Sequence, residues 1–231
     1  MISSKIYAVE GIDGCGKSTL LHNILNFESA PFTNPIVVRE LSATETGRLA
    51  AKWVHTHDIT SNKKTALEAL KYLSDARDAA IEEVTLPHLK SGGCVFYDRF
   101  VATTWAYQAF NDSWKMDEVI REHIAQWQSK VSVSSTVFLD ISPCEVTRRM
   151  HERASQGGVV DPNDLKSTDY YQKLRERFIN TLTVPGVIPF ELLGDLIYIH
   201  ATADTTPVET LNIVLRTLSD HVSEVSPVKV P

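Results

Sequence analysis

The sequence predicts an α/β protein in which a five-stranded parallel sheet is covered by helices on both faces, a three-layer α/β/α arrangement. Short apolar runs typical of buried strands alternate five times with segments whose apolar residues recur at helical spacing. No internal repeat or linker interrupts this alternation. Parallel strands need helical crossovers between them, so the pattern favours one sheet with helices on both sides.

A glycine-rich stretch at residues 11–19 follows the first apolar run and precedes the first helical pattern. It reads G-x-x-x-x-G-K-S-T, so the glycines fall where a strand at residues 6–9 turns into a helix. Backbone N–H groups in such a loop surround phosphate oxygens, Lys17 reaches the β- and γ-phosphates, and Ser18 is placed to ligate magnesium. The motif therefore predicts a P-loop NTPase-type fold that binds ATP and Mg²⁺. The expected nucleotide-binding residues are Gly11, Asp13, Gly14, Cys15, Gly16, Lys17, Ser18 and Thr19.

Each further element is expected from its local pattern. Apolar residues recur every three or four positions in the expected helices, which cover residues 18–26, 46–53, 67–89, 171–182 and 208–222 and begin near 117 and 143. The expected strands are residues 6–9, 36–38, 94–97, 136–141 and 196–199. Prolines and glycines separate them at positions 31, 35, 92, 93, 185, 186 and 189.

Composition indicates a globular protein for small-molecule ligands. The 231 residues, 43% hydrophobic and 23% charged, are enough for one domain at residues 1–225 with a loose tail at 226–231. A net charge of −6 opposes general nucleic-acid binding. Three scattered cysteines suggest a reducing compartment, and no apolar run approaches the ~18 residues of a membrane helix. A strand expected within five residues of Met1 leaves no room for a signal peptide, so we expect a cytoplasmic location.

Charged residues directly follow two of the expected strands. Arg39 and Glu40 follow residues 36–38, while Asp98 and Arg99 follow residues 94–97. The carboxyl ends of parallel strands form the edge where ligands bind. Position alone leaves Arg39 equally open to a cleft or a surface loop. Asp98 could hold the magnesium ion through water, and Arg99 could hold an acceptor phosphate.

Other arginines admit two interpretations each. Arg77 shares the apolar stripe of residues 67–89, so it needs an anionic partner, either an internal carboxylate such as Asp98 or a ligand phosphate. Less than two helical turns contain three arginines, Arg148, Arg149 and Arg153. They form either an exposed basic face or a source of catalytic arginine for phosphoryl transfer. Residues 156–164 have loop composition, so residues 148–165 are expected to form a mobile lid. Beside the stripe at 171–182, Arg177 is interpreted as solvated charge, and Arg175 is left open.

Several segments together resemble the thymidylate kinase family of nucleoside monophosphate kinases. Residues 10–18 are similar to its E-G-x-D-G-x-G-K-S/T, Arg39-Glu40 to the start of its R-E-P-G-G-T loop, and residues 98–100 with 106–108 to its D-R-Y and A-Y-Q block. Residues 139–153 resemble its strand and lid helix, and residues 170–177 resemble the helix after the lid. These matches keep the family's order over about residues 5 to 215.

The resemblance implies that ATP phosphorylates a deoxynucleoside monophosphate, dTMP or a related or modified pyrimidine, to the diphosphate. Catalytic roles are implied for Lys17, Arg99, Arg149 and Arg153, the last two as alternative lid arginines. Substrate contacts are implied for Asp13, Arg39, Leu73, Arg77, Arg99, Thr103, Thr104 and Tyr107, with Ser18 and Asp98 at the metal. Of these, Arg39, Arg77 and Arg99 would hold the acceptor phosphate, Thr103 and Thr104 would lie beside the base, and Tyr107 would lie under the deoxyribose. A homodimer is a possible assembly.

The sequence also departs from the family pattern near the base and the lid. Leu-Ser-Ala-Thr follows Glu40 in place of P-G-G-T, Leu73 stands where the family has a base-stacking phenylalanine, and the lid lacks D-R-x-E. One alternative is therefore a kinase for a nucleoside or modified-base hydroxyl, with Glu10, Asp13 or Glu40 as the general base. The other is a nucleotide-dependent regulatory protein. Such a protein needs a segment that recognises guanine or an effector, and the chain contains no N-K-x-D sequence.

Overall fold

A computed structural model describes residues 5–59, 62–108, 116–156 and 166–223. Within them, five parallel strands form one sheet in the order β2-β3-β1-β4-β5. The strands are β1 (Ile6–Glu10), β2 (Pro35–Val38), β3 (Cys94–Asp98), β4 (Ser135–Ile141) and β5 (Asp195–Ala201). The predicted five-stranded parallel sheet is confirmed, with strand ends within two residues of those expected.

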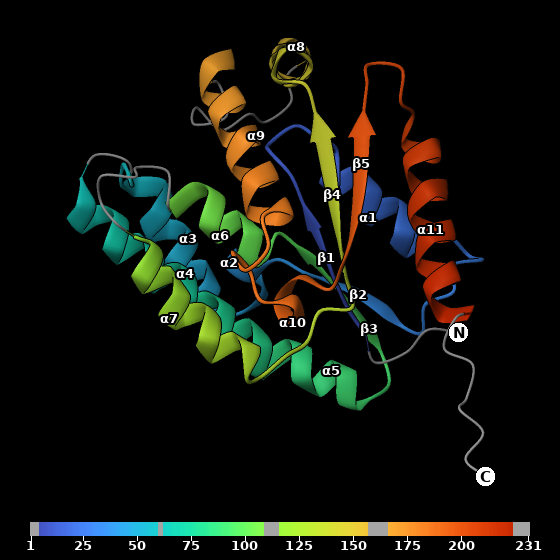
Figure 1. Ribbon diagram of the computed structural model, residues 1–231, viewed down its shortest axis with the longest axis horizontal. Helices are drawn as coiled ribbons and strands as arrows, with labels where there is room; N and C mark the ends of the chain where they lie inside the picture. The colour runs from blue at the N-terminus through green and yellow to red at the C-terminus, as the bar shows by residue number, and fades with distance from the viewer. Residues whose placement is uncertain (1–4, 60–61, 109–115, 157–165, 224–231) are drawn as a thin grey trace.

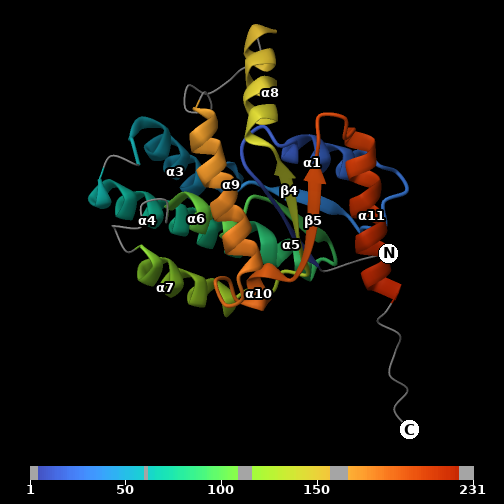
Figure 2. The ribbon, with the colours of Figure 1, turned by 45° about the horizontal axis from the view of Figure 1, so that its top comes forward.

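Helices cover both faces of this sheet. Helices α1 (Lys17–Asn26) and α11 (Pro207–Ser223) lie on one side, whereas α4 (Lys63–Ala80), α6 (Val101–Gln108), α7 (Asp117–Gln128) and α9 (Thr168–Thr183) lie on the other (Figures 1 and 2). The shorter helices are α2 (Glu40–Ala43), α3 (Glu45–Thr56), α5 (Leu86–Lys90) and α10 (Phe190–Leu193). Helix α8 (Pro143–Ser155) projects beyond the carboxyl ends of β4 and β5 in both views. The predicted three-layer arrangement is therefore present.

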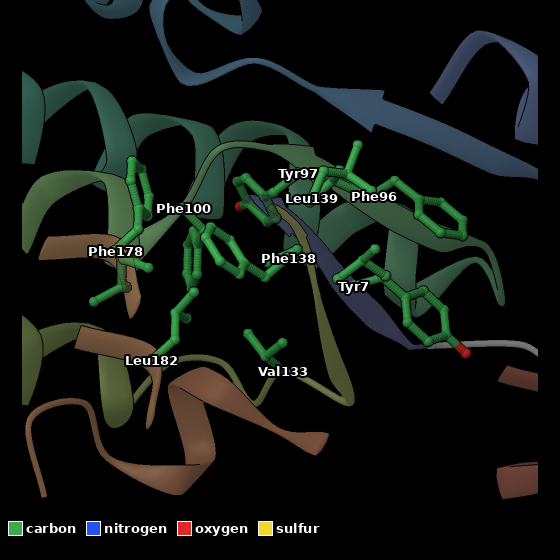
Figure 3. Close-up of a cluster of buried hydrophobic side chains, with 14 of the residues drawn as sticks. Tyr7, Phe96, Tyr97, Phe100, Val133, Phe138, Leu139, Phe178 and Leu182 are labelled. Atoms are coloured by element: carbon green, nitrogen blue, oxygen red, sulfur yellow. The ribbon is translucent and has the colours of Figure 1, made fainter. Parts of the chain in front are cut away.

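An aromatic core joins the sheet to its helices. Tyr7 of β1 stacks on Phe96 of β3 with ring centroids 4.9 Å apart, and Phe138 of β4 stacks on Phe178 of α9 at 5.8 Å. These four rings are fully buried and lie among the apolar side chains of Figure 3. Buried aromatic pairs of this kind bury large areas and fix the helix against the strand. Phe178 in particular holds α9 on the sheet.

The helix expected at residues 67–89 is instead divided into three parts. Helix α4 continues into a π-helical turn at Ile81–Thr85 and then into α5. Pro87 explains the division, because it has no amide hydrogen and its ring clashes with the carbonyl one turn earlier in an α-helix. The hydroxyl groups of Thr85 and Tyr97 lie 2.6 Å apart and join this turn to β3.

Parts of two expected features lie outside the described residues. The lid predicted at 148–165 is described only through residue 156, where α8 has just ended. The predicted tail at 226–231 is not described at all. None of the helices in the described ranges is long and apolar enough to cross a membrane.

Candidate active site

The phosphate loop runs from the end of β1 into α1, as the sequence predicts. Gly11, Gly14 and Gly16 have φ angles of 145°, 75° and 105°, in the region that favours glycine. A Cβ at position 11 would lie 2.7 Å from both the Cys15 sulfur and the Leu139 carbonyl oxygen. Only glycine fits there, and the loop can therefore close tightly against β4.

Lys17 is the first residue of α1 and is buried within this loop. Its Nζ donates hydrogen bonds to the carbonyl oxygens of Gly11 at 3.0 Å and Ile12 at 2.9 Å. No carboxylate among the described residues pairs with this ammonium group within 4 Å. Its positive charge therefore remains available for a phosphate.

Two cavities flank the phosphate loop and share part of their walls. The first has a volume of about 310 Å³ and is lined by Asp13, Gly14, Gly16, Lys17, Ser18, Thr19, Asp98, Arg99, Arg149, Met150 and Arg153. We call it the donor cavity, because the sequence predicts that ATP binds to this loop. The second has a volume of about 380 Å³ and is called the acceptor cavity, after the acceptor nucleotide that the family resemblance implies. Its polar lining includes Asp13, Arg39, Glu40, Arg77, Asp98, Arg99, Thr103, Thr104, Tyr107 and Gln108, and Leu41, Val54, Ile59 and Leu73 are apolar. Asp13, Asp98 and Arg99 line both cavities, so the two spaces adjoin at these three residues.

Asp13 and Arg99 form an ion pair where the cavities adjoin. The Arg99 guanidinium also donates to the Gly11 carbonyl at 2.9 Å, and the Tyr107 hydroxyl donates to Asp13 at 2.6 Å. Burial would raise the pKa of the Asp13 carboxyl, but the charges of Arg99 and Lys17 and the Tyr107 hydrogen bond lower this pKa to about 2. Asp13 is therefore ionised at neutral pH.

Arg99 has an unusual backbone conformation for a residue with a side chain. Its φ is 75°, in the left-handed region, directly after β3 ends at Asp98. Such a conformation is costly for a non-glycine residue and tends to occur at functional sites. It directs the guanidinium back to the phosphate loop carbonyl of Gly11.

Helix α6 is attached to β1 by a single carboxylate. The buried Glu10 accepts hydrogen bonds from the amides of Phe100 at 2.9 Å and Thr103 at 3.2 Å, and from the Thr103 hydroxyl at 2.5 Å. Glu10 thus satisfies free N–H groups at the start of α6. This places Thr103, Thr104 and Tyr107 of α6 along the acceptor cavity.

The sequence-based partner of Arg77 was wrong. Arg77 pairs with Glu40, with Nε at 2.5 Å from Oε1 and Nη2 at 2.9 Å from Oε2, while Asp98 pairs with Arg39 at 2.8 Å. The Arg77 guanidinium also lies over the Trp127 ring at 4.3 Å. Its Nη1 is buried and has no hydrogen-bond partner in the part of the chain that the structure describes. The guanidinium is therefore held mainly by internal partners, and its role toward a ligand stays a prediction.

The three crowded arginines of α8 separate into two groups. Arg149 and Arg153 line the donor cavity, whereas Arg148 does not and is half exposed. Arg148 pairs with Glu145 and Glu152, and Arg149 pairs with Glu145. Arg148 thus belongs to an exposed face, whereas Arg149 and Arg153 line a cavity together with the phosphate loop, and their role in phosphoryl transfer stays a prediction.

Sequence reasoning missed one polar feature, the partners of Asp140, and it placed Gln108 near the site. Asp140, 1% exposed, accepts hydrogen bonds from Arg175 at 2.5 and 2.7 Å and from the Tyr198 hydroxyl at 2.6 Å, so Arg175 joins α9 to β4. A carboxylate inside an apolar strand was the available indication of such a pair. Gln108 lines the acceptor cavity, and its buried Oε1 has no partner among the described residues. Its place one helical turn after Thr104 indicated this position.

The oxygen atoms near the phosphate loop suit a magnesium ion held mainly by phosphates. The described residues contain no group of three or more His, Cys, Asp or Glu side chains that could hold a metal. The Ser18 hydroxyl and the Asp98 carboxylate do line the same cavity as Lys17. Mg²⁺ takes few protein ligands when substrate phosphates and water complete its octahedral shell. These two side chains therefore fit Mg²⁺ that enters with a nucleotide.

Comparison with known proteins decides the family. The model of the family described as thymidylate kinase matches residues 9–186. The chain belongs to the thymidylate kinase family. It is 30% identical to the thymidylate kinase of Thermoanaerobacter sp. (strain X514) over 183 residues, which cover 77% of this chain and 83% of the relative. It is also 28% identical to the thymidylate kinase of Blochmanniella floridana over 205 residues, covering 85% of this chain and 94% of the relative.

Membership of the thymidylate kinase family confirms two predictions from the sequence. The family resemblance was carried by ordered motifs between residues 5 and 215, and the matched region falls inside that span. The chain is an enzyme of the nucleoside monophosphate kinase class. The family is typified by phosphoryl transfer between nucleotides, which requires two adjoining phosphate sites such as the two cavities described above.

Proposed function

We propose that this protein transfers the γ-phosphoryl group of ATP to dTMP and yields ADP and dTDP. One observation carries the proposal. The donor cavity around Lys17 and the acceptor cavity along α6 share Asp13, Asp98 and Arg99. A phosphoryl group must pass in line between two bound nucleotides, so their phosphates must meet at a common wall, where Arg99 supplies a positive charge beside the two carboxylates.

The residues of the two cavities have distinct tasks in this reaction. The phosphate loop amides and Lys17 bind the β- and γ-phosphates of ATP, and Ser18 and Asp98 would hold Mg²⁺, which would shield the charge of these phosphates. Arg99 lies between the cavities and reduces the repulsion between donor and acceptor phosphates. An arginine from α8, Arg149 or Arg153, then stabilises the charge that develops on the moving group. Arg39, which is half exposed, can reach the acceptor phosphate from the outer side.

The acceptor needs no general base. A phosphate monoester with a second pKa of about 6 is already largely a dianion at neutral pH and attacks directly. The carboxylates near the site agree with this requirement. Glu10 binds the start of α6, Glu40 binds Arg77, and Asp13 is held by Arg99 and Tyr107. Transfer to a hydroxyl group would need one of them free as a base, and so this alternative is not favoured.

The side chains of the acceptor cavity also suit a pyrimidine nucleotide. Leu41, Val54, Ile59 and Leu73 offer an apolar surface, while Thr103, Thr104 and Gln108 are the uncharged polar side chains of α6 beside it. Buried polar atoms without partners are costly, and a ligand that pairs with them recovers that energy. A flat base with carbonyl and N–H groups meets these requirements.

The test is a panel of acceptors incubated with ATP and Mg²⁺. The panel contains dTMP, dUMP, dCMP, thymidine and single-stranded DNA, and the products are separated by chromatography. We expect ADP and dTDP in equal amounts with dTMP, and no phosphorylated product from thymidine or DNA. Phosphorylation of thymidine or DNA in preference to dTMP would refute the proposal. ATP hydrolysis that no acceptor accelerates would refute it as well.

A further inference from the structure

Glu145 occupies a position that normally caps a helix. Residues 142–145 read S-P-C-E, which matches the capping-box pattern in which the glutamate accepts a hydrogen bond from the amide of the first residue. The Ser142 side chain performs its half of this motif and accepts from the Glu145 amide at 3.2 Å. Among the described residues, however, the Glu145 carboxylate is bonded to Arg148 and Arg149, and not to the Ser142 amide. Its side chain thus binds the two arginines of the next turn and does not cap the helix.

The bond to Arg149 engages one edge of the guanidinium group. Nε of Arg149 donates to Oε1 of Glu145 at 2.7 Å. A guanidinium is planar, so a bond at Nε restrains the group and leaves the N–H groups of the two terminal nitrogens for another partner, including the one N–H that lies beside Nε–H. Arg149 lines the donor cavity and also the cavity formed by Thr19, Leu20 and Leu139. Arg149 thus borders the space beside the phosphate loop, and Glu145 leaves its terminal nitrogens unused.

The backbone of α8 is fixed on the phosphate loop by separate contacts. A Cβ built on Gly14 would meet the Met150 sulfur at 3.2 Å and the Val146 side chain at 3.4 Å, so α8 packs closely on the loop. Packing thus sets where the Arg149 main chain lies, but it does not set the direction of a long, flexible side chain. Figures 1 and 2 show α8 above the carboxyl ends of the strands, and Figure 2 shows its axis leading away from the sheet.

Glu145 also offsets the repulsion between adjacent cations. Arg148 binds both oxygens of Glu145, with Nε at 2.7 Å and Nη2 at 2.6 Å, and has a second partner in Glu152. Arg149 has no such second carboxylate among the described residues. The Glu145 side chain is 8% exposed, and hydrogen bonds from Arg148 and Arg149 lower its pKa to about 2 despite burial. The carboxylate is therefore ionised throughout the working pH range.

From these contacts we infer that Glu145 is a positioning residue, whose carboxylate holds the Nε edge of Arg149 and directs its terminal nitrogens at the phosphoryl group in transfer. This inference rests on the proposed function. It also selects Arg149 over Arg153 as the arginine whose orientation is set before the donor arrives. An arginine oriented in advance needs less reorganisation in the transition state.

The first test compares two glutamine variants on the same helix. Glu145→Gln removes the charge that holds Arg149, whereas the control Glu152→Gln removes only the exposed partner of Arg148. Because a misplacement of about 1 Å can cost about 100-fold in rate, we expect Glu145→Gln to lower kcat about 10- to 100-fold. The KM for dTMP should stay within about twofold, and Glu152→Gln should match wild type. An unchanged kcat in Glu145→Gln, or an equal loss in Glu152→Gln, would overturn the inference.

The second test is a double-mutant cycle with Arg149→Ala. If Glu145 acts through Arg149, Glu145→Gln has no further effect on kcat once Arg149 is removed. A purely structural role would give the same fold loss in both backgrounds, and that result would overturn the inference. Urea unfolding of each variant shows whether it is folded at the assay temperature. Should Glu145→Gln not fold, Glu145→Asp keeps the charge but withdraws it by one methylene, and full activity in that variant would overturn the inference.

The cycle also separates this inference from the proposed function. Failure of wild type to form dTDP refutes the function and leaves the cycle to be measured on whichever acceptor the panel identifies. Formation of dTDP by wild type together with additive effects in the cycle refutes the role of Glu145 alone.

Discussion

Removal of the Glu40 carboxylate should destabilise the protein far more than removal of an exposed partner carboxylate. Arg77 is 2% exposed and its guanidinium donates two bonds to Glu40, so Glu40→Ala leaves a buried charge without its counterion. Breaking a buried ion pair in this way costs about 3–5 kcal/mol. A domain of this size loses about 2–4 °C in Tm for each kcal/mol, which gives a decrease of about 6–20 °C.

The assay is urea unfolding followed by tryptophan fluorescence, with the free energy of unfolding extrapolated to water. Glu45→Ala is the matched control, because Glu45 pairs with Arg48 on an exposed helix face and both side chains are more than half exposed. That pair should contribute less than about 1 kcal/mol. A loss below about 1 kcal/mol in Glu40→Ala would refute the argument that Arg77 depends on this carboxylate. The double variant Glu40→Leu with Arg77→Leu should recover much of the loss, since it removes both charges.

Three further predictions concern the site and its supports. Arg149→Ala should lower kcat and leave the KM for dTMP within about twofold, as measured by steady-state kinetics; an equal change in both would assign Arg149 to substrate binding. Asp13 has a pKa lowered from 3.8 to about 2, so its ionised form stabilises the fold above pH ~4 and this contribution is lost as pH falls towards ~2. Between pH 6 and pH 2, the Tm of Asp13→Asn should therefore fall less than the Tm of the wild type. Identical Tm profiles would contradict this contribution of Asp13. Arg175→Leu should destabilise the protein by about 3 kcal/mol or more in urea unfolding, because Asp140 loses its buried partner, whereas the exposed Lys173→Leu should have little effect.

The sequence predicted the architecture because the architecture depends on local patterns. Strand and helix periodicity are properties of short segments. The phosphate loop is recognised by its glycines together with the strand before it and the helix after it. The break in the helix at Pro87 was equally local, because a proline inside a helical pattern frees a carbonyl one turn earlier. The sequence could not show, however, whether this proline would produce a π-helical turn or a simple kink.

Ion-pair partners were beyond sequence reasoning because they depend on the three-dimensional course of the chain. Arg39 and Glu40 are neighbours, yet Arg39 turns to Asp98 while Glu40 enters helix α2 and turns to Arg77. Arg39 has extended backbone angles and Glu40 is the first residue of α2, so their side chains leave the chain in different directions and reach different partners. The sequence could place these charges at one edge of the sheet, but not pair them.

Glu10 gives the two halves of the site a common mechanical support. Glu10 is the last residue of β1, which leads into the phosphate loop. Its carboxylate also accepts hydrogen bonds at the start of α6, the helix that lines the acceptor cavity. Any strain that shifts the end of β1 is therefore transmitted to both nucleotides at once. The spacing between the two substrates is thus a built-in property of the scaffold, set before either nucleotide arrives.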